Sequence, residues 1–156
     1  GLPLPPFIHG GGQEGNYRSG TENLPGICGF AAACESADAP AEIAHMKDLR
    51  DYCREKAAEV PGLVLIGKQD APHIVNLSLP GLRSQGIINC LQTKGIYVSA
   101  GSACSKGHRS HVLEAMRLSP AVIDGSVRVS FCADNTKEDV DALIEALQEA
   151  KKTLKG

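Results

Sequence analysis

Hydrophobic positions recur at helical spacing in several stretches of the chain, and each stretch predicts a helix. Residues 22–37 are small and apolar, with Pro25 where a first helical turn accepts it. After a break at Pro40, a second stripe leads to Pro61-Gly62 and consists of Ile43, Met46, Leu49, Cys53, Ala57 and Val60. Further helices are expected at about 84–94, at 110–116 with Ser110 as a cap, and from Thr136, where Asp139 completes a helix-start signal.

Alternating apolar and polar residues predict strands. Residues 73–79 place Val75, Leu77 and Leu79 on one face. Residues 126–131 place valines and Phe131 on one face and Ser126, Arg128 and Ser130 on the other. Short apolar runs at 63–66 and 96–98 complete the set. The order of these elements predicts a small α/β fold, in which helices cover one face of a mainly antiparallel sheet.

Length and composition are typical of one soluble globular domain. The chain has 156 residues, of which 42% are apolar and 22% charged. The net charge is −2 and like charges do not cluster, which argues against nucleic acid and anionic membrane surfaces as partners. No apolar run reaches the roughly 20 residues of a membrane span. The Pro-rich start is unlike a signal peptide, and the missing initiator Met suggests a piece of a longer chain.

Six cysteines raise the question of disulfides or metal ligands. No pair has the C-x-x-C spacing, so reduced thiols in a cytoplasmic protein are the simpler interpretation. Cys28, Cys34, Cys53 and Cys90 lie in predicted helices and Cys132 ends a predicted strand, and we expect these five to pack in the interior. Cys104 differs from them because its neighbours are small and cationic.

The segment around Cys104 has the composition of a reactive-thiol loop. Lys106, His108 and Arg109 lie within five residues of Cys104, and nearby cations lower the pKa of a thiol. A helix N-terminus follows, which also favours an anion. A surface thiol without a role remains an equally open interpretation. Zinc is not predicted, because Cys104, His108 and His111 lack an obvious fourth ligand nearby.

Two stretches together resemble the cysteine desulfurase family, the NifS-like branch of class V aminotransferases. "GGGQEGNYRSGTEN" (10–23) is similar to the family's G-G-G-Q-E-x-G-x-R-S-G-T segment, and "VSAGSACSKGHRSHVLEAM" (98–116) is similar to its S-S-G-S-A-C active-site loop. "GSVRVSF" (125–131) resembles a late strand that carries a substrate-binding arginine. The order and spacing of the three also match. The resemblance implies the small domain of a fold-type I pyridoxal phosphate enzyme.

The resemblance also implies a reaction and roles for individual residues. The family uses pyridoxal 5′-phosphate to take sulfur from L-cysteine, leaves L-alanine, and passes the sulfur to acceptors such as iron–sulfur scaffold proteins. It implies that Cys104 is the nucleophile that becomes a persulfide, that Arg128 holds the substrate carboxylate, and that Thr21 donates to a cofactor phosphate. That cofactor belongs to the neighbouring subunit, so a homodimer is implied.

Other motif residues have weaker assignments. Arg18 either pairs with phosphate or braces the Gly-rich loop, and bracing is favoured. Gln13 and Glu14 are expected to hold the backbone of that loop. His108 either shuttles protons and tunes Cys104 or is an exposed histidine without a role.

The family's cofactor lysine lies in a His-Lys motif that this chain lacks. We therefore expect residues 1–21 to be a lead-in from the large domain and dimer interface, and 22–156 to be the small domain, with the active-site loop at 99–109. The chain alone is expected to lack desulfurase activity. Two alternatives stay open: a stand-alone sulfur-carrier module with a reactive thiol, and a plain interaction domain with an idle one.

Overall fold

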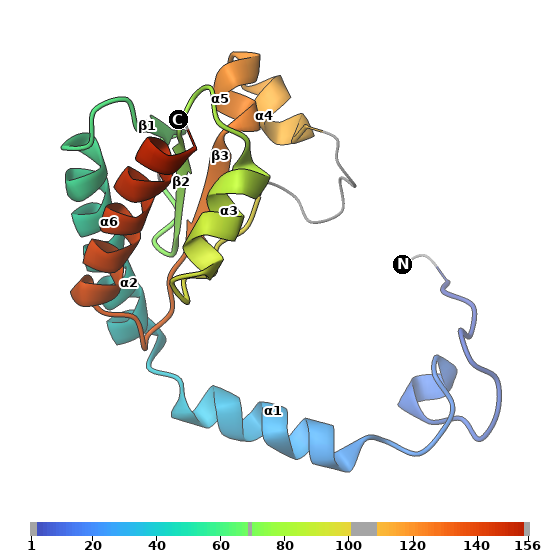
Figure 1. The fold of residues 1–156 in the computed structure, drawn as a ribbon. Coiled ribbons are helices and arrows are strands. Elements are labelled where there is room, and N and C mark those ends of the chain that lie inside the picture. The colour runs from blue at the N-terminus through green and yellow to red at the C-terminus, as the bar shows by residue number, and fades with distance from the viewer. Residues whose placement is uncertain (1–2, 69, 101–108, 155–156) are drawn as a thin grey trace. The chain divides into compact units, whose positions relative to one another are not determined.

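The structure, a computed structural model, describes residues 3–68, 70–100 and 109–154. Two compact units make up the chain, Gly1–Asp38 and Ala39–Gly156. Figure 1 shows the elements of both units in chain order. The predicted division into a lead-in that ends at residue 21 and a small domain that follows it concerns a longer protein and stays a prediction.

The first unit contains the Gly-rich segment, residues 10–23, and one helix. The 3-10 turn η1 (Glu14–Asn16) lies within the Gly-rich segment, and helix α1 spans Leu24–Ser36. Pro25 occupies the first turn of α1, as predicted, and the Asn23 side chain caps it by accepting the Gly26 N–H at 3.2 Å. Within the described chain, α1 buries none of its residues. Local capping and small residues, rather than tertiary packing, therefore account for this helix here.

The second unit is built on a three-stranded antiparallel sheet. Its strands β1 (Val64–Ile66), β2 (Ile74–Ser78) and β3 (Ser126–Ser130) lie in the order β1-β2-β3. Val75 pairs with Val129 and Leu77 with Val127, so the alternating apolar residues of both long strands share one face. The predicted small antiparallel sheet is confirmed.

Three helices cover the apolar face of this sheet (Figure 1). Helix α2 (Ala39–Ala58) packs on β1 and β2, α3 (Ser84–Gln92) packs on β3, and α6 (Lys137–Thr153) packs on both α2 and α3. The core between them includes Leu49, Leu77, Ile87, Leu91 and Leu147, each at most 1% exposed. Burying one such side chain contributes about 1.5–3 kcal/mol relative to leaving it in water. The sheet that presents Arg128 on its other face thus rests on a well-packed support.

Two short helices lie between residues 99–109, the cysteine segment, and β3. Helix α4 spans His111–Ala115 and α5 spans Pro120–Asp124. Leu113 and Ile123 pack with Ile66 in a second small apolar cluster. The sequence reasoning missed α5, although Ser119 followed by Pro120 is a recognisable helix start. This helix matters because its last residue contacts the end of the cysteine segment.

Three local predictions were wrong. Residues 96–98 do not form a strand, and only the next residue, Ser99, forms a bridge, which pairs it with Arg128. Ser110 occupies the N-cap position of α4, but its side chain makes no capping hydrogen bond. Pro40 does not separate the first two helices, since α2 begins at Ala39 and accommodates Pro40 in its first turn, where a missing N–H costs no hydrogen bond.

Most of the predicted packing cysteines are not packed in this chain. Cys53 is fully buried in α2, and burial raises its pKa to about 12. Cys90 is half-buried, whereas Cys28, Cys34 and Cys132 are exposed. Helical placement alone does not decide burial, because Cys28 and Cys34 lie on a helix that packs against nothing in the described chain.

Candidate functional site

The start of the cysteine segment is fixed to the strand that carries Arg128. The Ser99 N–H donates to the Arg128 carbonyl at 3.1 Å, and the Arg128 N–H donates to the Ser99 carbonyl at 2.7 Å. The alternation of β3 turns the N–H and C=O of Arg128 away from β2, so they are free to accept this partner. Sequence order alone does not reveal this contact, because 29 positions separate the two residues.

The Arg128 side chain lies on the exposed face of the sheet. Its neighbours on the strand, Val127 and Val129, are 1% and 6% exposed and anchor β3 to the core. Among the described residues, the Arg128 guanidinium has no hydrogen-bond or ion-pair partner. A planar guanidinium with its donors unoccupied is well shaped for a carboxylate. The position agrees with the predicted substrate-binding role, which stays a prediction.

The end of the cysteine segment is held by an ion pair with α5. Arg109 Nε donates to Asp124 Oδ1 at 2.6 Å and Arg109 Nη2 donates to Asp124 Oδ2 at 2.8 Å. These hydrogen bonds lower the pKa of Asp124 and raise that of Arg109. Arg109 was expected to act as one of the cations around Cys104, yet two of its donors are engaged with a carboxylate. Sequence reasoning did not single out Asp124 or Ser99.

Cys104 and His108, the predicted nucleophile and its neighbour, lie outside the described residues. Their roles therefore stay predictions. Among the residues that the structure describes, no group of three or more histidine, cysteine or acidic side chains could hold a metal ion. No described helix combines the length and apolar character that a membrane-spanning segment needs.

In the first unit, side chains of the Gly-rich segment brace its own backbone. Arg18 Nη1 donates to the carbonyls of Gly20 at 3.0 Å and Thr21 at 3.4 Å. Gln13 Oε1 accepts the Gly20 N–H at 3.1 Å, and Glu14 lies 3.9 Å from Arg18. These contacts agree with the bracing interpretation of Arg18, Gln13 and Glu14.

Thr21 follows this braced turn and is exposed. Arg18 holds the Thr21 carbonyl, while the Thr21 hydroxyl has no hydrogen-bond partner within the described residues. A free hydroxyl on a braced turn suits a phosphate oxygen as acceptor. The donor that the sequence predicts for a cofactor phosphate is therefore chemically compatible with that group.

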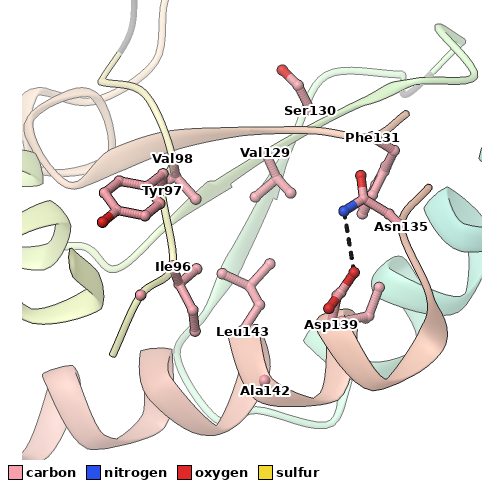
Figure 2. A pocket seen from close by; sticks show the side chains of 12 residues that line it. Ile96, Tyr97, Val98, Val129, Ser130, Phe131, Asn135, Asp139, Ala142 and Leu143 are labelled. Atoms are coloured by element: carbon pink, nitrogen blue, oxygen red, sulfur yellow. Dashed lines mark hydrogen bonds between the residues drawn. The ribbon is translucent and has the colours of Figure 1, made fainter. Parts of the chain in front are cut away.

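A cavity of about 320 Å³ lies beside the end of β3, where Val129, Ser130 and Phe131 line it. Figure 2 shows Ile96, Val129 and Leu143 around it, with Tyr97 at one side and Asn135 hydrogen-bonded to Asp139 at the other. It forms where residues 96–98 fail to continue the pairing of Ser99 with β3. Neither Arg128 nor Ser99 lines it, so the cavity is separate from the candidate site.

The family model of class-V aminotransferases matches residues 8–143. The chain belongs to the class-V aminotransferase family. Among curated class-V relatives, "Cysteine desulfurase IscS" of Methanosarcina thermophila is 37% identical over 162 aligned positions, which cover 100% of this chain and 40% of that protein. The protein of the same name from Dictyoglomus turgidum is 36% identical and is covered to 39% of its length.

Solved structures of NifS-like proteins also match the chain. A structure titled "NIFS-LIKE PROTEIN" superposes with a TM-score of 0.84 and 35% identity, covering 99% of this chain and 40% of that one. A NifS-like protein from Rickettsia africae gives a TM-score of 0.80 at 29% identity, with 97% and 41% covered. The fold expected from the sequence, that of a NifS-like small domain, is confirmed. The chain spans about two fifths of the length of the class-V proteins that it matches.

Proposed function

We propose that this chain is part of a pyridoxal phosphate-dependent cysteine desulfurase, in which Cys104 takes sulfur from L-cysteine. The observation that carries the proposal is the backbone pairing of Ser99 with Arg128. This pairing starts the cysteine segment beside an exposed guanidinium that has no partner among the described residues. Relatives named cysteine desulfurase support the same reaction.

Arg128 and Cys104 would act on opposite ends of one small substrate. The Arg128 guanidinium would bind and orient the L-cysteine carboxylate through paired hydrogen bonds. Cys104 follows Ser99 by five residues, and an extended chain spans at most about 3.3–3.6 Å per residue. The backbone from Ser99 to Cys104 therefore spans at most about 18 Å, which keeps the nucleophile near the bound substrate.

The sulfur transfer balances as a substitution at the substrate sulfur. The Cys104 thiolate forms a new S–S bond, and the Cβ–S bond of the substrate breaks. The bond's electron pair stays on the carbon fragment, which takes up a proton to become L-alanine. The sum is one thiol plus L-cysteine giving one persulfide plus L-alanine. Pyridoxal phosphate supplies the electron sink that makes such a cleavage feasible.

Thr21 would donate its hydroxyl to a phosphate oxygen of that cofactor, and the Arg18 contacts would hold the backbone of the donor in place. In the proposed homodimer, this cofactor is bound by the neighbouring subunit. The persulfide sulfur would then pass to an acceptor such as an iron–sulfur scaffold protein. We infer a cytoplasmic enzyme, because reduced thiols suit that compartment.

The test uses the full-length protein with pyridoxal phosphate and L-cysteine. We expect one alanine per persulfide, a mass increase of one sulfur on the peptide that contains Cys104, and loss of both in C104S. The exposed thiol of Cys132 provides the matched control, since C132S should retain full turnover. Alanine formation that persists in C104S would contradict the proposal. The 156-residue chain alone, lacking a His-Lys pair, is expected to form no alanine; turnover there would contradict that part.

A further inference from the structure

The cysteine segment is attached at one end to β3 and at the other end to the last residue of α5, just before β3. Ser99 pairs with Arg128 inside the strand. Arg109 pairs with Asp124, which lies two residues before the first residue of β3. Both attachments thus lead to one short stretch of the chain, 124–128. Closing a chain between two fixed points removes conformational freedom from everything between them.

Asp124 is itself held in place by its surroundings. It is the last residue of α5, whose Ile123 is 7% exposed within the second apolar cluster. The next residue, Gly125, gives its carbonyl to the Leu79 N–H at 3.1 Å. The backbone of Asp124 is therefore fixed by its packed neighbours, although its carboxylate is partly exposed to solvent.

The geometry of the pair is that of a fork. Both carboxylate oxygens of Asp124 accept from separate nitrogens of Arg109, at 2.6 and 2.8 Å. Isolated surface ion pairs contribute little, but two-pronged arginine–carboxylate pairs fix orientation as well as distance. A fork between Arg109 and the end of a packed helix can set where the chain that follows Cys104 returns to the fold.

We propose that the Arg109–Asp124 ion pair is a positioning pair for persulfide formation. It fixes the C-terminal end of the cysteine segment relative to the strand that carries Arg128. The inference rests on the proposed function and gives Arg109 a role other than that of a cation that activates the thiol. Because Asp124 balances its charge, Arg109 contributes through geometry.

Single-turnover persulfide formation on Cys104 in the full-length protein, measured across pH 6–10, tests this proposal. We expect R109Q and D124N each to lower the rate roughly three- to tenfold. The double variant should be no slower than the slower single variant, because either change already opens the fork. The KM for L-cysteine should stay the same, since neither residue is proposed to touch the substrate.

The pH profile separates positioning from charge. If the pair acts by positioning, both variants should reach a lower plateau rate at high pH, where the thiolate is fully formed. The pH at which the rate is half of its plateau should be the same as in the wild type. If Arg109 instead activates the thiol through its charge, R109Q would raise the pH of half-maximal rate and D124N would lower it. The plateau rate would not change. Opposite shifts with an unchanged plateau would overturn the proposal.

Hydrogen exchange of residues 109–118 in the full-length protein supplies a readout independent of turnover. Both single variants should exchange faster there, and R109K should fall between wild type and R109Q, because lysine cannot form the fork. The swapped variant R109D/D124R should recover part of the rate. A matched control is the exposed Lys94–Glu149 pair between the end of α3 and α6, where K94Q and E149Q should leave persulfide formation unchanged.

The outcomes also separate this inference from the proposed function. A wild-type protein that forms no Cys104 persulfide overturns both. A wild-type protein that forms it at the same rate as R109Q and D124N overturns only the positioning role. Equal slowing by K94Q would likewise overturn it, because the effect would then be a general loss of stability.

Discussion

Ser99 and Arg128 exchange both of their backbone hydrogen bonds, at 3.1 and 2.7 Å. This single bridge connects the start of the cysteine segment to the middle of β3. It uses the N–H and C=O groups that the strand turns away from β2. As a result, the backbone of Arg128 holds the start of the cysteine segment, while its side chain lies on the exposed sheet face with no partner in the described part of the chain. One residue thereby joins the two parts of the candidate site.

The first prediction concerns the exposed guanidinium of Arg128. In the full-length protein, R128A should raise the KM for L-cysteine roughly 10- to 100-fold, the loss expected for a charged hydrogen-bonding partner of a carboxylate. R128K should recover only part of this, because lysine keeps the charge without the fork. Steady-state kinetics measure both effects. S130A, at an exposed position of the same strand, is the control; an R128A variant with an unaltered KM would remove Arg128 from the substrate site.

Much of the fold could be predicted from periodicity. The alternation in 73–79 and 126–131 identified the two long strands. The predicted buried stripe of the last helix identified α6, but one of its members was wrong, since Leu154 follows the helix and is 39% exposed; the stripe was Val140, Leu143, Ile144, Leu147 and Leu154. These signals work because one face of each element is buried, which imposes a period on the sequence. The strand predicted at 96–98 failed because apolar residues there line a cavity instead of pairing.

The candidate site was predictable only in part. Motifs indicated Arg128 and Thr21, whose roles stay predictions, but gave no information on what holds the cysteine segment. Ser99 contributes through its backbone, which no side-chain pattern reports. Asp124 contributes through a partner fifteen residues away, and its helix was missed. Contacts of this kind depend on tertiary packing, which a single sequence does not display.

The second prediction concerns Gly125, at the start of β3. A Cβ built there would lie 2.3 Å from the Leu79 carbonyl oxygen and 3.2 Å from that of Leu82, so the backbone must shift to accept a side chain. G125A should lower the free energy of unfolding by about 1–3 kcal/mol. Urea unfolding followed by circular dichroism measures the loss. Gly86 in α3 is the matched control, since its Cβ would meet only the Leu154 side chain at 3.5 Å; equal losses in G86A and G125A would contradict the steric argument.

The third prediction concerns the capping box that starts α6. The Thr136 side chain accepts the Asp139 N–H, and the Asp139 carboxylate accepts the Thr136 N–H at 3.0 Å. T136A should lower the free energy of unfolding by about 0.5–2 kcal/mol. T136S should retain most of the stabilisation that the cap provides, because serine keeps the hydroxyl. Urea unfolding of both variants tests this. A T136A variant as stable as wild type would show that α6 is held by packing alone.

The same box predicts a pH dependence. The Thr136 backbone N–H and the Asn135 amide lower the pKa of Asp139 in the folded state. A lowered folded pKa means that this stabilisation is present above the unfolded pKa of about 3.9 and is lost as the pH falls through the folded value. The difference in unfolding free energy between wild type and D139N should therefore shrink below about pH 4. A difference that stays constant from pH 7 to pH 3 would contradict the assignment.

The last prediction separates buried from exposed thiols. The pKa of Cys53 is raised to about 12 by burial, and its side chain is fully covered. At pH 8 only about one such thiol in ten thousand is ionised, and the thiolate is the reactive form. Iodoacetamide followed by peptide mass spectrometry should therefore modify Cys132 and leave Cys53 unmodified in the native chain. In 6 M urea both should react at similar rates, because unfolding removes the cover and restores an ordinary pKa; native labelling of Cys53 as fast as Cys132 would show that the α2 contact with the sheet opens readily.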